Sequence, residues 1–127
     1  MSPHDTAPMA DRNDPVAEAV DLLEAFECTE YEAKCFVALT RIGRGPAKAV
    51  SEVADVPQAR VYDCMESLQN RGMVDVQGST PREYRAVSPE QAIETLERRV
   101  SKRLDRLGTL LPELEAPEAA DDGGVWI

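Results

Sequence analysis

The fold of this chain is decided by residues 45–87, GPAKAVSEVADVPQARVYDCMESLQNRGMVDVQGSTPREYRAV. A helix is expected over residues 46–54, because proline fits its first position, where the missing N–H costs nothing. The Asp-Val-Pro run at residues 55–57 predicts a turn, since the residue before a proline is pushed out of helical geometry. A second helix is expected over residues 58–70. Its apolar residues recur at steps of four and three and share one face, with a cysteine beside them: Val61, Met65, Leu68 and Cys64.

A β-hairpin is expected directly after this second helix. Gly72 is typical of a helix C-terminal cap. Residues 73–77 and 83–87 are strand-like, and the link between them, residues 78–82, is rich in turn-forming residues and carries an arginine at its tip. Helix, turn, helix and hairpin together predict a winged helix-turn-helix, a mainly α fold with a small β hairpin.

Two further helices are expected before this stretch. Residues 15–26 form a short helix whose apolar stripe we expect to face the domain. Thr29 and Glu32 stand at the two positions of a capping box, which predicts the start of a helix that runs to about residue 42. The buried face expected for this helix consists of Tyr31, Cys35, Ala38, Leu39 and Ile42.

A long helix is expected after the hairpin, over residues 88–115. Ser88 and Gln91 form a second capping box at its start. Its apolar residues then recur at steps of three and four in a narrow stripe flanked by charged residues, which is typical of a coiled-coil seam. We therefore predict a homodimer, and the alternative is a helix packed on its own domain. The predicted dimer contacts are Leu96, Val100, Leu104, Leu107 and Leu111.

Charge is distributed unevenly along the 127 residues, whose net charge is −10. Residues 1–28 carry −6, residues 29–87 are neutral and residues 88–127 carry −4. Only three of the 14 basic residues are lysines, and such an acidic, lysine-poor surface is typical of a protein from a salt-accumulating halophile. No apolar run approaches the ~18 residues of a membrane helix, and the N-terminus lacks a signal-peptide core. We therefore expect a cytoplasmic protein.

The residue types needed for catalysis or metal binding are sparse. The single histidine, His4, lies in an N-terminal tail, and no glycine-rich phosphate loop or nucleophile–base motif is present. The three cysteines have no C-x-x-C spacing, which argues against a disulfide framework and against a zinc site. Cys35 and Cys64 fall on the buried helix faces, so we expect them to belong to the core. We expect no enzyme activity, no cofactor and no metal.

Several motifs in order resemble the DNA-binding domain of the TrmB family of archaeal transcription regulators. They are Thr29 to Ala33, Val56-Pro57, Arg60 to Asp63, Leu68, Arg71 to Val74 and Tyr84 to Val87, and the resemblance covers roughly residues 20–115. It implies a sequence-specific DNA-binding transcription regulator. Longer members continue into a sugar- or effector-binding domain, for which this chain has no room, so we expect no small-molecule effector to bind within it. The expected organisation is residues 1–14 as a disordered tail, 15–87 as the winged helix-turn-helix DNA-binding domain, 88–115 as the dimerisation helix and 116–127 as an acidic tail.

The second helix of such a pair lies in the major groove of DNA with its N-terminal residues at the base edges. The candidates are Gln58, Ala59, Arg60 and Tyr62. Arg60 has the alternative of a surface ion pair with Asp63 or Glu66, and Tyr62 that of packing against the wing. Phosphate or minor-groove contacts are expected from Arg44, Lys48, Ser51, Thr80, Arg82 and Arg85. A dimer would contact a palindromic operator in double-stranded DNA, with half-sites about one helical turn apart.

Cys28 is the candidate for a redox switch, because it lies just before the capping Thr29, where helix N–H groups favour a thiolate. Nearby glutamates oppose the added negative charge. Short redox-responsive members of the resembled family occur in halophilic archaea. The alternative role of Cys28 is a small apolar side chain that packs at the helix start. For the whole chain, the alternative function is a winged-helix adaptor that binds proteins and has no specific DNA site.

Overall fold

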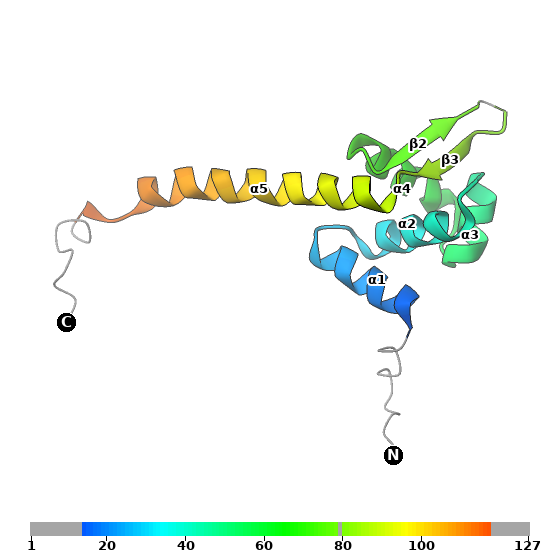
Figure 1. Cartoon of the computed structure of the whole chain (residues 1–127), viewed down its shortest axis with the longest axis horizontal. Helices are drawn as coiled ribbons and strands as arrows, with labels where there is room; N and C mark the ends of the chain where they lie inside the picture. The colour runs from blue at the N-terminus through cyan, green and yellow to red at the C-terminus, as the bar shows by residue number, and fades with distance from the viewer. Residues whose placement is uncertain (1–13, 79, 118–127) are drawn as a thin grey trace, which may run out of the picture. The chain divides into compact units, whose positions relative to one another are not determined.

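The computed structural model describes residues 14–78 and 80–117 (Figure 1). The expected disordered and acidic tails therefore lie almost wholly outside the described residues. The elements are α1 (Pro15–Ala25), α2 (Glu30–Ile42), β1 (Arg44–Gly45), α3 (Ala47–Ala54), α4 (Gln58–Asn70), β2 (Val74–Gln77), β3 (Glu83–Ala86) and α5 (Pro89–Leu114). The prediction of a mainly helical winged helix-turn-helix followed by a long helix is confirmed. The chain forms two compact units that meet within α5, one ending at Thr95 and one beginning at Leu96.

The sheet has three antiparallel strands rather than the two of the predicted hairpin, in the order β1-β3-β2. In the added pairing Arg44 lies opposite Arg85 and Gly45 opposite Tyr84. A Cβ atom at Gly45 would lie 3.2 Å from Ile42 Cδ1 and press on it, so glycine suits the passage from α2 into β1. A strand of two residues is too short to show alternation, and the sequence therefore did not reveal it.

The core of the first unit forms where α2, α3, α4 and the sheet meet. The predicted buried face of α4 is confirmed, since Val61, Cys64, Met65 and Leu68 are its buried residues. In α2 the prediction holds for Cys35, Ala38 and Leu39, which are buried. Tyr31 and Ile42, one near each end of that helix, are only half-buried. The largest fully buried side chains are Leu39, Met65, Leu68, Met73, Val50, Val56, Val61, Val74 and Cys35.

Helix caps follow the sequence closely. The Thr29 hydroxyl accepts the Glu32 N–H at 3.1 Å, and the Glu32 carboxylate accepts the Thr29 N–H at 2.9 Å, which completes the predicted capping box of α2. At the start of α5 the Ser88 hydroxyl accepts the Gln91 N–H at 3.1 Å. These local hydrogen bonds satisfy backbone donors that a helix N-terminus leaves unpaired.

The first helix, α1, has no buried residue in this chain, although its apolar stripe was expected to face the domain. Val16, Val20 and Leu23 are half-buried, whereas Leu22 of the same stripe is 54% exposed. Phe26, which follows the helix, is 45% exposed. The stripe is therefore only partly covered by its own chain. No helix in the described part of the chain is long and apolar enough to cross a membrane.

Candidate nucleic-acid interface

One face of α4 points away from the core. The helix is preceded by a turn whose shape depends on two residues, Asp55 and Ser51. Asp55 caps α3 in the left-handed conformation at φ 59°, which short polar side chains tolerate better than most. The Ser51 hydroxyl donates to the Val56 carbonyl oxygen at 2.6 Å and closes the turn. Its one hydroxyl proton is used there in the chain without DNA, and the phosphate contact of Ser51 stays a prediction. α4 then starts after Pro57, which provides no side-chain cap and leaves the positive end of the helix dipole open.

Gln58 and Tyr62 lie together on one side of the exposed α4 face. The Gln58 amide nitrogen donates to the Tyr62 hydroxyl at 3.2 Å, as expected for residues one turn apart. Tyr62 is 50% exposed. The hydrogen-bond partner of the Tyr62 hydroxyl lies on α4 itself, whereas the predicted alternative for Tyr62 was packing against the wing. Together the two side chains form a polar, exposed edge in the first two turns of the helix.

Arg60 lies on the other side of α4, because two residues along a helix are about 200° apart around its axis. Its guanidinium stacks over the Tyr31 ring of α2 at 5.1 Å from the ring centroid. The predicted pairing with Asp63 or Glu66 therefore has a competitor that the sequence did not indicate. Gln58 and Arg60, predicted as neighbouring base contacts, thus face opposite flanks of the helix.

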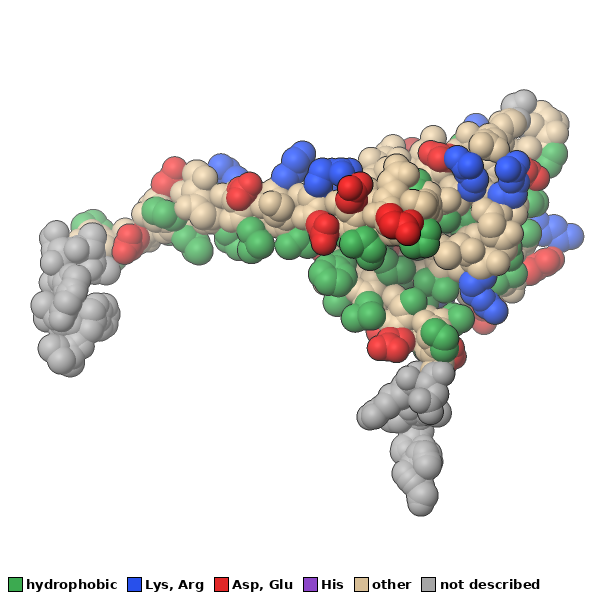
Figure 2. Space-filling model, viewed as in Figure 1, with side chains coloured by type: hydrophobic (Ala, Val, Ile, Leu, Met, Phe, Trp, Pro, Cys, Tyr) green, Lys and Arg blue, Asp and Glu red, His purple; other side chains and the backbone are tan. Residues whose placement is uncertain are grey.

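Basic side chains lie around α3 and the β2–β3 hairpin (Figure 2). Lys48, Arg82 and Thr80 are exposed. Arg85 pairs with Asp75 across the hairpin at 3.1 Å, and both side chains are about half exposed. Arg44 donates to the Gln77 side-chain oxygen at 3.4 Å. The Arg85–Asp75 pair follows from the strand register, which places Arg85 between Arg44 and Asp75, and the sequence alone did not specify that register.

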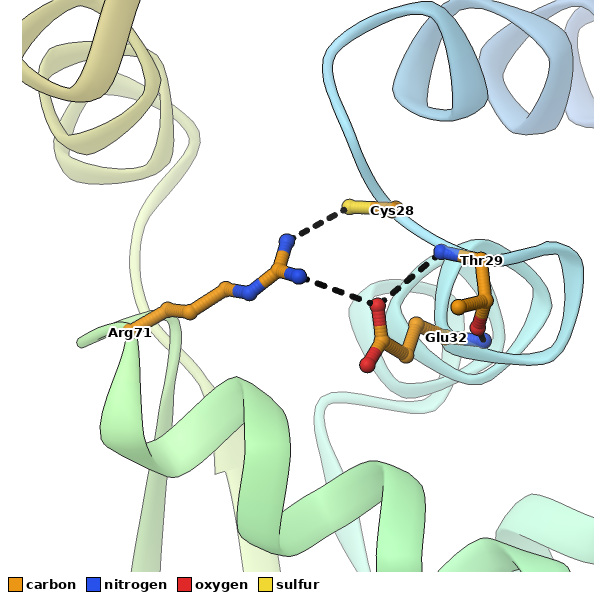
Figure 3. A network of polar contacts seen from close by, with 4 residues as sticks. All are labelled: Cys28, Thr29, Glu32 and Arg71. Carbon is orange, nitrogen blue, oxygen red and sulfur yellow. Dashed lines mark hydrogen bonds and ion pairs between the residues drawn. The ribbon is translucent and has the colours of Figure 1, made fainter. Parts of the chain in front are cut away.

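Cys28 belongs to a part-buried polar network that joins the start of α2 to the end of α4 (Figure 3). Arg71, which caps α4, donates from Nη1 to Cys28 Sγ at 3.6 Å and places Nη2 3.4 Å from Glu32 Oε1. The Glu32 carboxylate also accepts the Thr29 N–H of the capping box. Cys28 is 5% exposed. The sequence prediction missed Arg71, which lies 43 positions after Cys28.

The apolar row of α5 is exposed over most of its length. Figure 2 shows hydrophobic side chains along one side of this helix and charged side chains along the other. Leu104 is 61%, Leu107 48% and Leu111 58% exposed, and Val100 is 36% exposed. Leu96 is only 7% exposed, so this predicted dimer contact is buried within its own chain. Among the predicted dimer contacts, the exposed row therefore starts at Val100 and not at Leu96.

The comparisons with known proteins agree with this fold. The family model for the sugar-specific transcriptional regulator TrmB matches residues 23–90. The chain is 32% identical over 97 residues to the HTH-type sugar sensing transcriptional regulator TrmBL1 of Pyrococcus furiosus, a match to 76% of this chain and 28% of that protein. It is also 34% identical over 104 residues to the DNA-binding HTH-type transcriptional repressor TrmBL2 of Thermococcus kodakarensis. This match covers 81% of this chain and 37% of that protein.

A solved structure of TrmBL2, described as an archaeal chromatin protein with a novel mode of DNA binding, is also similar. Its TM-score is 0.67 at 30% identity, over 85% of this chain and 41% of that one. The chain therefore spans about a third of the length of the curated relatives named above.

Proposed function

The chain belongs to the TrmB family of transcriptional regulators, and from this we propose that it is a sequence-specific DNA-binding transcription regulator that acts as a homodimer in the cytoplasm. The observation that carries the proposal is the exposed N-terminal part of α4, whose opposite face is locked into the core. In this fold class the second helix of the pair enters the major groove. Residues 15–87 would bind DNA and residues 88–115 would form the dimer.

Gln58 supports direct recognition of a base. Its amide can donate to and accept from adenine at once, and it lies at the first position of α4, where base edges are reached. Ala59 and Tyr62 would make the neighbouring contacts. Arg60 would contact a base or phosphate after leaving the Tyr31 ring, a stacking interaction of about 0.5–1 kcal/mol. The phosphate contacts would come from Arg44, Lys48, Ser51, Thr80, Arg82 and Arg85.

We expect Gln58→Ala to weaken binding to the cognate operator by roughly 5- to 150-fold, because a bidentate base contact contributes about 1–3 kcal/mol of discrimination. The measurement is fluorescence anisotropy on DNA from upstream of the gene, in molar KCl, since the net charge of −10 suits a salty cell. Gln69→Ala is the matched control, because Gln69 is an exposed residue of the same type near the other end of α4. Equal losses for both variants would contradict a base contact by Gln58. Absence of any specific binding by the wild type would favour the protein-binding adaptor instead.

The homodimer is supported by the exposed apolar row of α5, which a second copy would cover. Two copies joined through this row would present two α4 helices, and the operator would be palindromic with half-sites about one helical turn apart. A footprint that protects one asymmetric half-site would contradict this arrangement.

The Arg71 contact favours a thiol switch at Cys28. A guanidinium beside the sulfur stabilises the thiolate, which is the form that oxidants attack. Hypochlorous acid would convert this thiolate to a sulfenic acid, whose added oxygen would press on Arg71 at the end of α4. We expect the change in operator affinity on mild oxidation to be larger for the wild type than for Cys28→Ser, measured by the same anisotropy assay. Equal changes in the two proteins would leave Cys28 as a packing residue.

A further inference from the structure

The side of α4 that points away from the core carries two carboxylates. The buried residues of this helix share the opposite side and are Val61, Cys64, Met65 and Leu68. Since each residue turns a helix by about 100°, the positions farthest from them are Ala59, Asp63 and Glu66. All three are exposed, and Tyr62 lies on their flank. A groove that receives α4 therefore meets Asp63 near the middle of the helix face.

Both carboxylates are available for contacts outside the chain. Arg60 is the only basic residue of α4, and its guanidinium lies over the Tyr31 ring of α2. Among the described residues, 14–78 and 80–117, neither Asp63 nor Glu66 makes an ion pair or a hydrogen bond. Ala59, one turn before Asp63, has a side chain too short to hold the helix away from a surface. The middle of this face therefore offers hydrogen-bond acceptors and no basic side chain.

Acceptors on a helix in the major groove discriminate between the four bases. Guanine presents N7 and O6 there and thymine presents O4, and all of these atoms are acceptors that repel a carboxylate. Adenine presents an amino group, but its acceptor N7 lies beside it. Cytosine presents its N4 amino group without an acceptor of its own, and Asp or Glu pairs with this group. Because the phosphates also repel a carboxylate, its place in the groove is favourable only where such a donor meets it.

We propose that Asp63 determines operator specificity by accepting a hydrogen bond from the N4 amino group of a cytosine in the major groove. Glu66 accepts from a second cytosine, since three residues advance a helix by about 4.5 Å, close to the spacing of about 3.4 Å between base pairs. Exposed bases such as Lys48 and Arg82 hold the phosphates and offset the repulsion. This assignment rests on the proposed function and adds to it the base that each half-site contains.

The first test changes the DNA. The preferred duplex is selected from a random library with the full wild-type chain in molar KCl. Each cytosine is then replaced in turn by pyrimidin-2-one, which pairs with guanine but lacks the amino group. At one position we expect the replacement to weaken wild-type binding by roughly 5- to 150-fold, the range of one good base contact, and binding by Asp63→Ala by about twofold or less. If no cytosine shows this dependence on Asp63, the proposal is overturned.

The second test changes the side chain without changing its size. Asparagine pairs with adenine through N6 and N7, so selection with Asp63→Asn should favour adenine over cytosine at that one position. Loss of a negative charge should also raise affinity for random DNA by roughly two- to fivefold while affinity for the wild-type operator falls. A misfolded variant would lose both affinities. Asp21→Asn, which makes the same change at an exposed position of α1, should select the wild-type sequence.

The outcomes separate this inference from the proposed function. Loss of the cytosine preference at one position supports the role of Asp63, whichever base replaces it. An unchanged cytosine preference in Asp63→Asn overturns that role and leaves the proposed function standing. Glu66→Gln should alter a different cytosine position, and no change there refutes the contact of Glu66. If the wild-type chain selects no sequence at all, the proposed function fails and the assignment of both carboxylates fails with it.

Discussion

Replacing Leu104 and Leu107 of α5 by aspartate is expected to convert a dimer into a monomer and to weaken operator binding by about 100-fold or more. The two leucines are 61% and 48% exposed in the single chain. Covering a leucine side chain in the dimer stabilises it by roughly 1.5–3 kcal/mol. A buried, unpaired carboxylate in its place destabilises the dimer by several times as much. The loss of DNA affinity follows because a monomer engages one half-site where a dimer engages two.

Sedimentation equilibrium at several protein concentrations measures the mass, and circular dichroism confirms that α5 stays helical. The matched control is Lys102→Gln with Thr109→Asp, which changes the net charge by the same amount at exposed positions of α5 on the side away from the leucine row. The control should remain dimeric and bind the operator normally. A dimeric mass for the leucine variant, or a monomeric wild type, would refute dimerisation through this row.

Most of the fold was predictable from local signals in the sequence. The buried face of α4 follows from helical spacing, and the capping box of α2 from two residues three positions apart. Such features depend only on residues close in the chain. β1 was not predictable, because its pairing with β3 is made by only two residues far from their partners. The exposure of Leu22 was also missed, since a stripe reveals which side of a helix is apolar but not what covers it.

The sequence indicated which residues belong to the candidate interface but not how their side chains are placed relative to one another. Gln58 and Arg60 are close in sequence, yet helical geometry places them on opposite flanks of α4. The Tyr31 ring under Arg60 and the carbonyl oxygen that holds Ser51 are tertiary or turn contacts, and no sequence spacing indicates them. Arg71 was missed for the same reason, although it is the residue that joins Cys28 to the end of α4.

Arg71→Met is expected to destabilise the first unit by about 3 kcal/mol or more, because breaking a buried ion pair leaves a charge in a poorly solvated site. The Arg71 side chain is 16% exposed and its partner Glu32 is 10% exposed, at an N–O distance of 3.4 Å. Methionine keeps much of the arginine stem, so the loss reports chiefly on the guanidinium. The measurement is the free energy of unfolding in urea at one fixed protein concentration, since the proposed dimerisation would make stability depend on concentration.

The double variant Arg71→Met with Glu32→Gln distinguishes charge from packing. Removing the carboxylate charge together with the guanidinium should recover much of the loss, because an apolar or neutral replacement of a buried pair is often tolerated. Glutamine still offers an oxygen that can accept the Thr29 N–H, so the cap of α2 is retained. A coupling of at least 1 kcal/mol between the two substitutions would identify a true ion pair, within the range for residues in contact. Strictly additive losses would mean that Arg71 stabilises the end of α4 by packing alone, and the electrostatic argument for a reactive Cys28 would lose its main support.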